Sequence, residues 1–288
     1  MNTNNKPWIL TAKCPSQLGT VDAATRYMAN AKNYINEIHS FDDKESQTFF
    51  IRVEFSPQDP AFDQDKLQLD FGQHAKKFEM EWQLRSPQCR PKVAILVSKY
   101  DHCLNDLLYR HRTGQLDIDI PVIISNHGDL RELAQWHGID FHHLPITKAT
   151  KVAQEADIVS LLAKYKIELV VLARYMQILT PAMCQHLDGW AINIHHSLLP
   201  GFKGAKPYHQ AWDKGVKFVG ATAHYVTNDL DEGPIIAQGV HSVGHELYPA
   251  DLIAKGQDIE RVTLFNAVRY HVEMRVFING SRTVVFGD

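Results

Sequence analysis

The chain contains 288 residues, of which 44% are hydrophobic and 22% are charged, and its formal net charge is -3. This composition excludes disordered and fibrous proteins, and the length is typical of two domains. The lack of a basic excess argues against nucleic acid as a partner. No apolar run approaches the ~20 residues of a membrane-spanning helix, so no association with membranes is expected.

The cysteines indicate a reducing compartment. Cys14, Cys89, Cys103 and Cys184 are far apart and form no CxxC pair. We interpret them as free thiols rather than as a disulfide framework. The first residues carry no apolar core of a signal peptide. A cytoplasmic protein is therefore expected.

The first block of the chain alternates strand-like and helix-like patterns. Apolar residues recur at helical spacing from Val21 to Ile38, whereas 48–55 is rich in β-branched and aromatic residues, as strands are. The predicted elements are a strand at 9–12, a helix at 21–38, a loop at 39–46, a strand at 48–55, a helix at 65–79 and a strand at 81–85. This order predicts a ferredoxin-like α+β domain over 1–86, followed by a proline-containing linker at 87–92.

The second block, 93–288, repeats the order of strand and helix. Its continuous apolar runs are typical of parallel strands that are covered on both faces. Strands are predicted at 93–97, 121–124, 169–173, 191–195, 219–226 and 235–240, helices at 102–111, 129–137 and 149–165, and a hairpin at 276–286. The pattern predicts a Rossmann-like, mostly parallel open sheet with helices on both faces.

Isoleucines alternate with polar residues in the strand-like segment 191–195. Because side chains two residues apart share a face of a strand, Asn193 and His195 should project together while the isoleucines enter the core. An amide beside an imidazole suits a ligand carbonyl at the C-terminal end of a strand, where open α/β sheets bind ligands. The alternative is that both are polar groups satisfied at a strand end. His196 is expected to be structural or to line a pocket, and a His-His metal site has less support because no HxH or HxxxH motif accompanies it.

An acidic loop, residues 227–234, precedes an apolar strand-like run. Its carboxylates Asp229, Asp231 and Glu232 would ordinarily mark a solvated turn. A carboxylate that faces His195, however, can hold an imidazolium and take a proton from water. Such an arrangement would complete a hydrolytic site, and spacing alone leaves open which of the three carboxylates turns inward.

Two further segments bear on the ligand. Residues 172–179 (LARYMQIL) either form the wall for a flat, apolar-faced heterocycle or belong to the ordinary core. After the strand at 93–97 the chain reads SKYDHC (98–103), without the GxGxxG or GxxxxGK motif whose backbone cradles a phosphate. This absence disfavours nicotinamide cofactors, ATP and sugar phosphates.

Four segments together resemble the folate-dependent formyltransferase family, and most closely its formyltetrahydrofolate deformylase branch: 193–238, 98–108 (SKYDHCLNDLL), 172–179 and 204–209 (GAKPYH). The resemblance covers nearly the whole chain. It implies a formyltransferase domain that hydrolyses 10-formyltetrahydrofolate to tetrahydrofolate and formate without a metal or redox cofactor. Because the loop for a phosphorylated amine acceptor is missing, water is the expected acceptor.

The family's catalytic trio is an Asn, a His two residues later and an Asp in the acidic loop, which correspond to Asn193, His195 and Asp231. We expect Asn193 and protonated His195 to stabilise the oxyanion. Asp231 would orient and deprotonate the attacking water and would hold the charge of His195. The residues that the resemblance implies for folate binding are Arg174, Tyr175, Met176, Gln177, Ile178, Leu179, Val226 and Thr227, with His224 in a supporting role.

The N-terminal block resembles an ACT domain, a ferredoxin-like module that often binds amino acids. Cys14, Gly19 and the run 49–55 carry this likeness. It implies regulation by methionine or glycine at a site that includes Cys14 and Gly19, and a homo-oligomer in which these modules pair. Two alternatives remain open: transfer of the formyl group to an amine or a tRNA, and a non-catalytic amino-acid sensor with a degenerate folate fold.

Overall fold

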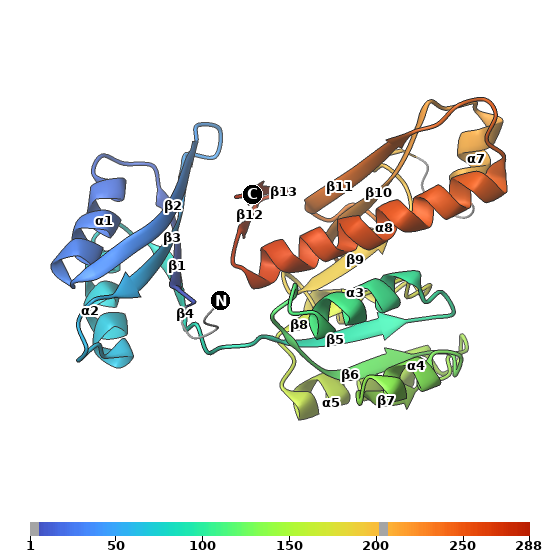
Figure 1. Ribbon diagram of the computed structural model, residues 1–288, viewed down its shortest axis with the longest axis horizontal. Helices are drawn as coiled ribbons and strands as arrows, with labels where there is room; N and C mark the ends of the chain where they lie inside the picture. The colour runs from blue at the N-terminus through green and yellow to red at the C-terminus, as the bar shows by residue number, and fades with distance from the viewer. Residues whose placement is uncertain (1–5, 202–206) are drawn as a thin grey trace. The chain divides into compact units, whose positions relative to one another are not determined.

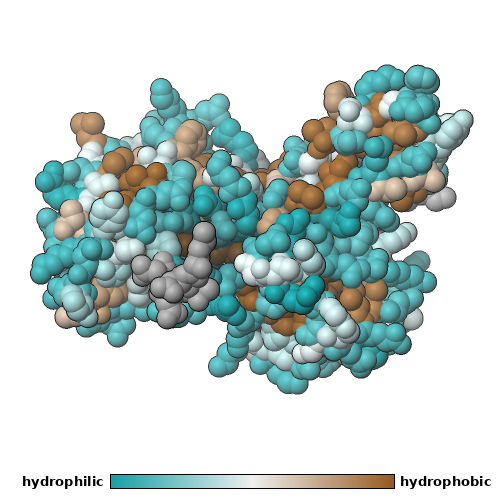
Figure 2. All heavy atoms as spheres, in the orientation of Figure 1, coloured by the Kyte–Doolittle hydropathy of each residue, from teal (hydrophilic) through white to brown (hydrophobic). Residues whose placement is uncertain are grey.

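The structure is a computed structural model that describes residues 6–201 and 207–288. It divides into two compact units (Figure 1). The first contains Met1–Cys89, Met274–Asn279 and Val284–Asp288, and the second contains Arg90–Glu273 and Gly280–Thr283. Figure 2 shows a mostly hydrophilic visible surface on which apolar residues form scattered patches. Among the described residues, no helix combines the length and the apolar character needed to cross a membrane.

The first unit is a four-stranded sheet with two helices. Its elements are β1 (Trp8–Pro15), α1 (Thr20–Asn30), β2 (Asn33–Asp43), β3 (Thr48–Pro57), α2 (Gln64–Lys76) and β4 (Glu81–Arg85). The strand order is β2-β3-β1-β4 and every pairing is antiparallel. The succession of elements and the strand order are ferredoxin-like, as predicted. Leu10, Phe55 and Phe71 are fully buried between the sheet and the helices.

The helix predicted at 21–38 and the loop predicted at 39–46 are wrong beyond residue 30. The helix ends at Asn30, and β2 occupies Asn33–Asp43. A β-bulge lies between Ile35 and Glu37, so that Ile35 pairs with Phe55 and Ile38 pairs with Val53. Because of this extra residue, Ile35 and Ile38 lie on one face of the strand although they are three positions apart. Their spacing imitates the period of a helix.

The second unit is a seven-stranded sheet in the order β11-β10-β9-β8-β5-β6-β7. The strands from β9 to β7 are parallel, and β10 and β11 are antiparallel to their neighbours. This confirms the mostly parallel open sheet. The elements are β5 (Lys92–Val97), α3 (His102–Arg112), β6 (Asp119–Ser125), α4 (Arg131–Trp136), β7 (Asp140–His143), α5 (Lys151–Tyr165), β8 (Leu169–Leu172), α6 (Pro181–His186), β9 (Ala191–His195), α7 (Pro207–Asp213), β10 (Phe218–Tyr225), β11 (Ile235–Ser242) and α8 (Pro249–Val272).

Both faces of this sheet are covered. Ala94 and Leu96 of β5 pack in one cluster with Ile158 of α5 and Met183 of α6. The alternate residues of β5, which point to the opposite face, are also fully buried. On the opposite face α3 packs against α8, and α8 runs along β9 and β10 (Figure 1).

The sequence analysis missed β7, α6, α7 and α8. The 24-residue helix α8 is the largest omission. The start of α8 has a capping residue that the sequence contains, because Asp251 accepts a hydrogen bond from the backbone N–H of Tyr248 at 3.0 Å. Its buried stripe, however, includes Gly256, Glu260 and Thr263, so the apolar period of the helix is interrupted.

The C-terminal hairpin is present as predicted, with strands β12 (Val276–Asn279) and β13 (Arg282–Val285). Most of it belongs to the first unit, whereas the sequence placed all of 93–288 in the second domain. The reason is Phe50, which points to the opposite face of β3 from the helix-covered core. Phe50 packs with Phe277 and Phe286 in a separate aromatic cluster.

Candidate active site

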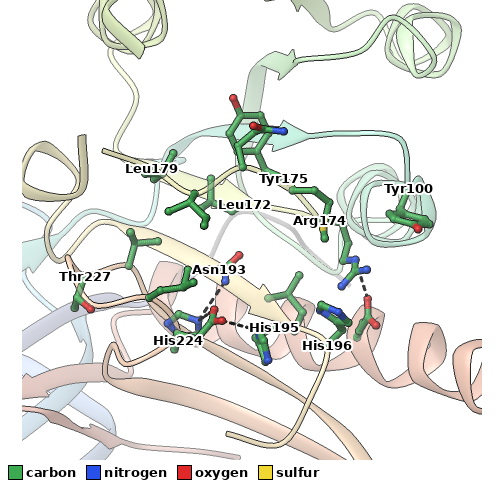
Figure 3. A pocket seen from close by; sticks show the side chains of 18 of the residues that line it. Tyr100, Leu172, Arg174, Tyr175, Leu179, Asn193, His195, His196, His224 and Thr227 are labelled. Atoms are coloured by element: carbon green, nitrogen blue, oxygen red, sulfur yellow. Dashed lines mark hydrogen bonds and ion pairs between the residues drawn. The ribbon is translucent and has the colours of Figure 1, made fainter. Parts of the chain in front are cut away.

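The site begins where β9 and β10 lie side by side. His195 is the last residue of β9, and His224 of β10 is paired with Asn193 of β9. Paired residues of antiparallel strands point to the same face, so His224 lies next to Asn193. Figure 3 shows Asn193, His195 and His224 gathered on one side of a cavity, as the alternation of 191–195 predicted.

The acidic loop between β10 and β11 turns back onto this strand end. Asp231 has a left-handed backbone with φ 58°, a conformation that Asp tolerates better than most residues. At Gly233 a Cβ atom would lie 1.7 Å from the carbonyl oxygen of Tyr225, so only glycine permits the close return. The backbone N–H of Tyr225 donates to the carbonyl of Pro234 at 2.9 Å. The loop is thereby held with Asp231 beside β9.

The loop geometry decides which carboxylate turns inward. Asp231 Oδ2 lies 3.2 Å from His195 Nδ1, and Asp231 Oδ1 lies 3.7 Å from His224 Nε2. Asp229 also lines the cavity, but it forms no ion pair with either histidine. Asp231 is therefore the carboxylate partner of His195.

His224 orients the amide of Asn193. Its Nδ1 lies 2.8 Å from the carbonyl oxygen of Tyr225, which can only accept, so Nδ1 carries the hydrogen. In the neutral ring, Nε2 is then an acceptor and receives a hydrogen bond from Asn193 Nδ2 at 3.2 Å. One N–H of the Asn193 amide is engaged in this way, and the second is left for a ligand.

The trio has the charge distribution that an oxyanion needs. Burial raises the pKa of the Asp231 carboxyl, but its interactions with the adjacent histidines, chiefly the hydrogen bond from His195, outweigh burial and hold it well below its ordinary value. Asp231 is therefore ionised at neutral pH and can balance a positive charge on His195. With His195 Nδ1 occupied, its Nε2 is buried and has no hydrogen-bond partner among the described residues. This nitrogen is the one available to a bound ligand.

The cavity has a volume of about 680 Å³, which suits a heterocyclic ligand. The segment after β8 forms one wall and is fixed from outside by hydrogen bonds: Ser98 Oγ accepts from the backbone N–H of Met176 at 3.0 Å, and Gln154 Nε2 donates to the Tyr175 hydroxyl at 2.8 Å. Every residue that the sequence analysis implied for catalysis or folate binding lines this cavity: Arg174, Tyr175, Met176, Gln177, Ile178, Leu179, Asn193, His195, His224, Val226, Thr227 and Asp231.

The sequence did not predict a buried cluster of charged and polar residues that lines the same cavity around Glu260. Glu260 of α8 is 1% exposed and accepts hydrogen bonds from His102 Nε2 and from the Tyr208 hydroxyl, both at 2.8 Å. Its Oε2 lies 3.4 Å from Arg174 Nε. Burial raises the pKa of Glu260, but the hydrogen bond from His102 and the charge of Arg174 outweigh it, so the pKa falls below its ordinary value. Glu260 lies four residues after Gly256 and four before Leu264, and this buried spacing on α8 was the available signal.

One group of side chains could hold a metal ion among the described residues. His102, Cys103 and Glu260 each offer a ligand atom, and these atoms lie within 4.8 Å of one another. Here, however, His102 and Tyr208 already satisfy the Glu260 carboxylate, and the adjacent Arg174 opposes a cation. Burial raises the pKa of the Cys103 thiol, which disfavours the thiolate that binds metals.

His196 lines the cavity next to the trio. Its ring lies 5.2 Å from that of His195 and 6.1 Å from that of Tyr208, centroid to centroid. Burial, assisted by the charge of Arg174, lowers the pKa of His196 to about 4. The ring is therefore neutral at physiological pH, in agreement with its prediction as a pocket-lining residue.

The remaining predicted positions lie elsewhere. Cys14 is buried in the core of the first unit, and burial raises the pKa of its thiol to about 11. Gly19 precedes α1 with φ 87°, a conformation that favours glycine. Of the GAKPYH motif, residues 204–206 lie outside the described part of the chain.

Comparison with known proteins places this site in a family. A family model described as formyl transferase matches residues 91–268. Formyltetrahydrofolate deformylase of Corynebacterium sp. (strain P-1) is 50% identical over 277 residues, which are 96% of this chain and 97% of that protein. The crystal structure of a formyltetrahydrofolate deformylase from Pseudomonas putida KT2440 superposes with a TM-score of 0.93 at 58% identity, covering 97% of this chain and 99% of the other. The crystal structure of formyltetrahydrofolate deformylase from Burkholderia mallei ATCC 23344 superposes with a TM-score of 0.93 at 49% identity. The match covers 98% of this chain and 100% of the other.

The fold and the site thus define a member of the formyl transferase class. Near-full-length similarity narrows the assignment, and the chain belongs to the formyltetrahydrofolate deformylase family.

Proposed function

We propose that the protein hydrolyses 10-formyltetrahydrofolate to tetrahydrofolate and formate. The observation that carries the proposal is the pairing of Asp231 with His195 at 3.2 Å beside the amide of Asn193, in a cavity that can hold a folate. Membership of the deformylase family supports the same reaction.

The formyl group of the substrate is an amide whose oxygen becomes negatively charged when water attacks its carbon. The free N–H of Asn193 and the Nε2–H of protonated His195 would donate to this oxygen and stabilise the oxyanion. Asp231 would hold the charge of His195 and orient the water, and it would take a proton from the water as the water oxygen bonds to the formyl carbon. The tetrahedral intermediate then loses the N10–carbon bond, N10 takes a proton, and formate leaves.

Water rather than an amine is the proposed acceptor. The residues between β5 and α3 are Ser98–Asp101, which include no glycine to let the backbone approach the phosphate of a phosphorylated acceptor. No metal or redox cofactor enters the proposed reaction.

The first unit is proposed to be a regulatory ACT-like module. Its ferredoxin-like strand order supports this assignment, and Gly19 at the start of α1 is the proposed contact for a regulatory methionine or glycine. Cys14 would act through packing, because its side chain lies in the core. We further propose a cytoplasmic homo-oligomer in which these modules pair.

The direct test is to incubate the purified protein with 10-formyltetrahydrofolate in the absence of an amine acceptor. Formate and tetrahydrofolate should appear in equal amounts. Turnover only after an amine is added would make the protein a transferase, and no turnover in either condition would favour a sensor. Addition of methionine or glycine to the same assay tests the regulatory proposal.

A further inference from the structure

The cavity has an apolar end and a polar end, and Asn193 and His195 lie between them (Figure 3). At the apolar end, Leu172 and Leu179 pack in one hydrophobic cluster below the sheet. The polar end, on the other side of His195, contains Tyr100, Arg174 and His196. A flat heterocycle suits the apolar end, so the polar end is left for the small molecules of the reaction, water and formate.

Arg174 brings a permanent positive charge and unused hydrogen-bond donors to the polar end. Of the described residues that line the cavity, Arg174 is the only arginine or lysine. Its side chain is buried, and within the described part of the chain its Nε and Nη1 have no hydrogen-bond partner. Buried polar groups are rarely left without a partner, because the loss of water is then not compensated. These donors therefore suit a ligand that carries acceptor oxygens.

Glu260 and Tyr100 position the guanidinium without using its donors. Glu260 Oε2 lies 3.4 Å from Arg174 Nε, but the contact lacks the geometry of a hydrogen bond. The two oxygens of Glu260 accept instead from His102 Nε2 and from the Tyr208 hydroxyl, both at 2.8 Å. Arg174 Cζ lies 5.1 Å from the centre of the Tyr100 ring. The charge of Arg174 is thus held in place while its N–H groups stay unsatisfied.

The backbone of Arg174 gives an independent indication of function. Its φ is 65°, in the left-handed region that residues other than glycine adopt at an energetic cost. Residues held in such conformations cluster at active sites and ligand clamps. In this conformation the buried side chain reaches the polar end of the cavity (Figure 3).

On the basis of the proposed hydrolysis, we propose that Arg174 binds the formate that is released beside Asn193, His195 and Asp231. Formate is a planar carboxylate, and the planar guanidinium can donate to both of its oxygens. The ionised Asp231 repels this anion where it forms, whereas Arg174 attracts it toward the polar end. Tetrahydrofolate stays at the apolar end, so the two products occupy separate parts of the cavity.

The test is inhibition of the full-length protein by added sodium formate. Tetrahydrofolate release is followed, and sodium chloride at the same ionic strength is the reference. Arg174→Gln should raise the inhibition constant for formate by roughly tenfold or more, because hydrogen bonds to charged groups are strong. The affinity for tetrahydrofolate, measured by titration, should stay near the wild-type value. Line broadening of ¹³C-formate in NMR spectra measures formate binding even in a variant that turns over slowly.

Two further variants complete the design. Arg174→Lys keeps the charge but lacks the planar fork, and its inhibition constant for formate should be intermediate. Arg131→Gln removes an exposed arginine at the start of α4, outside the cavity, and should leave inhibition by formate unchanged. Should Arg174→Gln fail to fold, Arg174→Lys decides alone, and a wild-type inhibition constant in that variant would overturn the inference.

The inference is also overturned if formate inhibits the wild type no more than chloride does, or if Arg174→Gln binds formate as well as the wild type. An equal loss of tetrahydrofolate affinity in Arg174→Gln would assign Arg174 to the folate instead. Stronger inhibition by inorganic phosphate than by formate would assign it to a phosphorylated ligand. Failure of the proposed function is distinguishable, because the wild-type protein would then release no tetrahydrofolate even without added formate.

Discussion

Asp231 combines burial with two histidine contacts, and this residue should be the most sensitive in the site. Asp231→Asn removes the charge that balances His195 while leaving the volume nearly unchanged. We expect kcat to fall by at least 100-fold with folate binding retained. Single-turnover kinetics and a binding titration with tetrahydrofolate measure the two effects separately. Near-normal turnover would remove Asp231 from the mechanism.

Glu260 should contribute to stability as well as to the shape of the site. Glu260→Ala leaves Arg174 buried without its carboxylate, and breaking a buried pair in this way costs about 3–5 kcal/mol of the free energy of unfolding. Denaturant titration measures this loss. A loss below about 1 kcal/mol would mean that Arg174 finds another partner.

The stability from Glu260 should depend on pH in a defined direction. Its pKa is lowered in the folded state, so its contribution is complete above the ordinary carboxyl pKa and is lost as pH falls through the folded value. The difference in unfolding free energy between wild type and Glu260→Gln should therefore shrink as the pH is lowered below about 4. A difference that grows in acid would contradict the assigned direction of the shift.

At this scale the sequence predicted part of the site. The alternation of 191–195 was sufficient to place Asn193 and His195 on one face, because the side-chain period of a strand is local. Spacing could not select Asp231 from its neighbours, since the choice depends on the left-handed backbone at that residue. For Glu260 the sequence offered only its spacing on α8, because its partners are contributed by distant segments of the chain.

At the scale of elements, regular strands and helices were predictable where their patterns are uninterrupted. The apolar run of β5 and the boundaries of β4 were found because each has a single local pattern. The helix predicted at 21–38 was wrong beyond residue 30, because a bulge in β2 gives Ile35 and Ile38 the spacing of a helix. Helix α8 was missed because Gly256, Glu260 and Thr263 interrupt its apolar stripe. Irregularity, rather than weak propensity, accounts for both errors.

Gly256 tests how closely α8 packs against the site. A Cβ atom there would lie 2.0 Å from the Tyr208 hydroxyl, which donates to Glu260. Gly256→Ala should gain about 1 kcal/mol of helix propensity but lose about 1–3 kcal/mol through the displaced ring. We expect lower stability and lower kcat. The control is Gly72→Ala in α2, where the new Cβ would make an ordinary contact, 3.4 Å from Trp82, and should stabilise the protein. A Gly256→Ala protein that is as stable and as active as wild type would contradict this packing.

At the scale of the whole molecule, each of the two units is made of more than one segment of the chain, so no single boundary in the sequence separates them. The last residues of the chain return to the first unit, where Phe286 and Phe277 cover Phe50. No local pattern near the C-terminus predicts that these residues pack in the first unit. The packing depends on Phe50, the single aromatic residue on the outer face of β3. The order of strands and helices was nevertheless enough to predict the mostly parallel sheet of the second unit.

Phe286→Ala should weaken the first unit selectively. Removing a buried phenylalanine costs roughly 3–5 kcal/mol, and the lower end is expected because Phe286 keeps 8% exposure. Hydrogen exchange should accelerate in peptides from β1 and β3, while those from β8 and β9 keep their protection. Equal acceleration in both units would contradict the assignment of the C-terminal strands to the first unit.

In the proposed reaction, water attacks the formyl carbon beside Asn193, His195 and Asp231. The most direct measurement is mass spectrometry of formate produced from unlabelled 10-formyltetrahydrofolate in ¹⁸O-enriched water, without an amine acceptor. We expect formate with one ¹⁸O atom, formed together with an equal amount of tetrahydrofolate, and a rate at least 100-fold lower for Asp231→Asn. Labelled formate at the same rate from both proteins, or none from wild type, would contradict it.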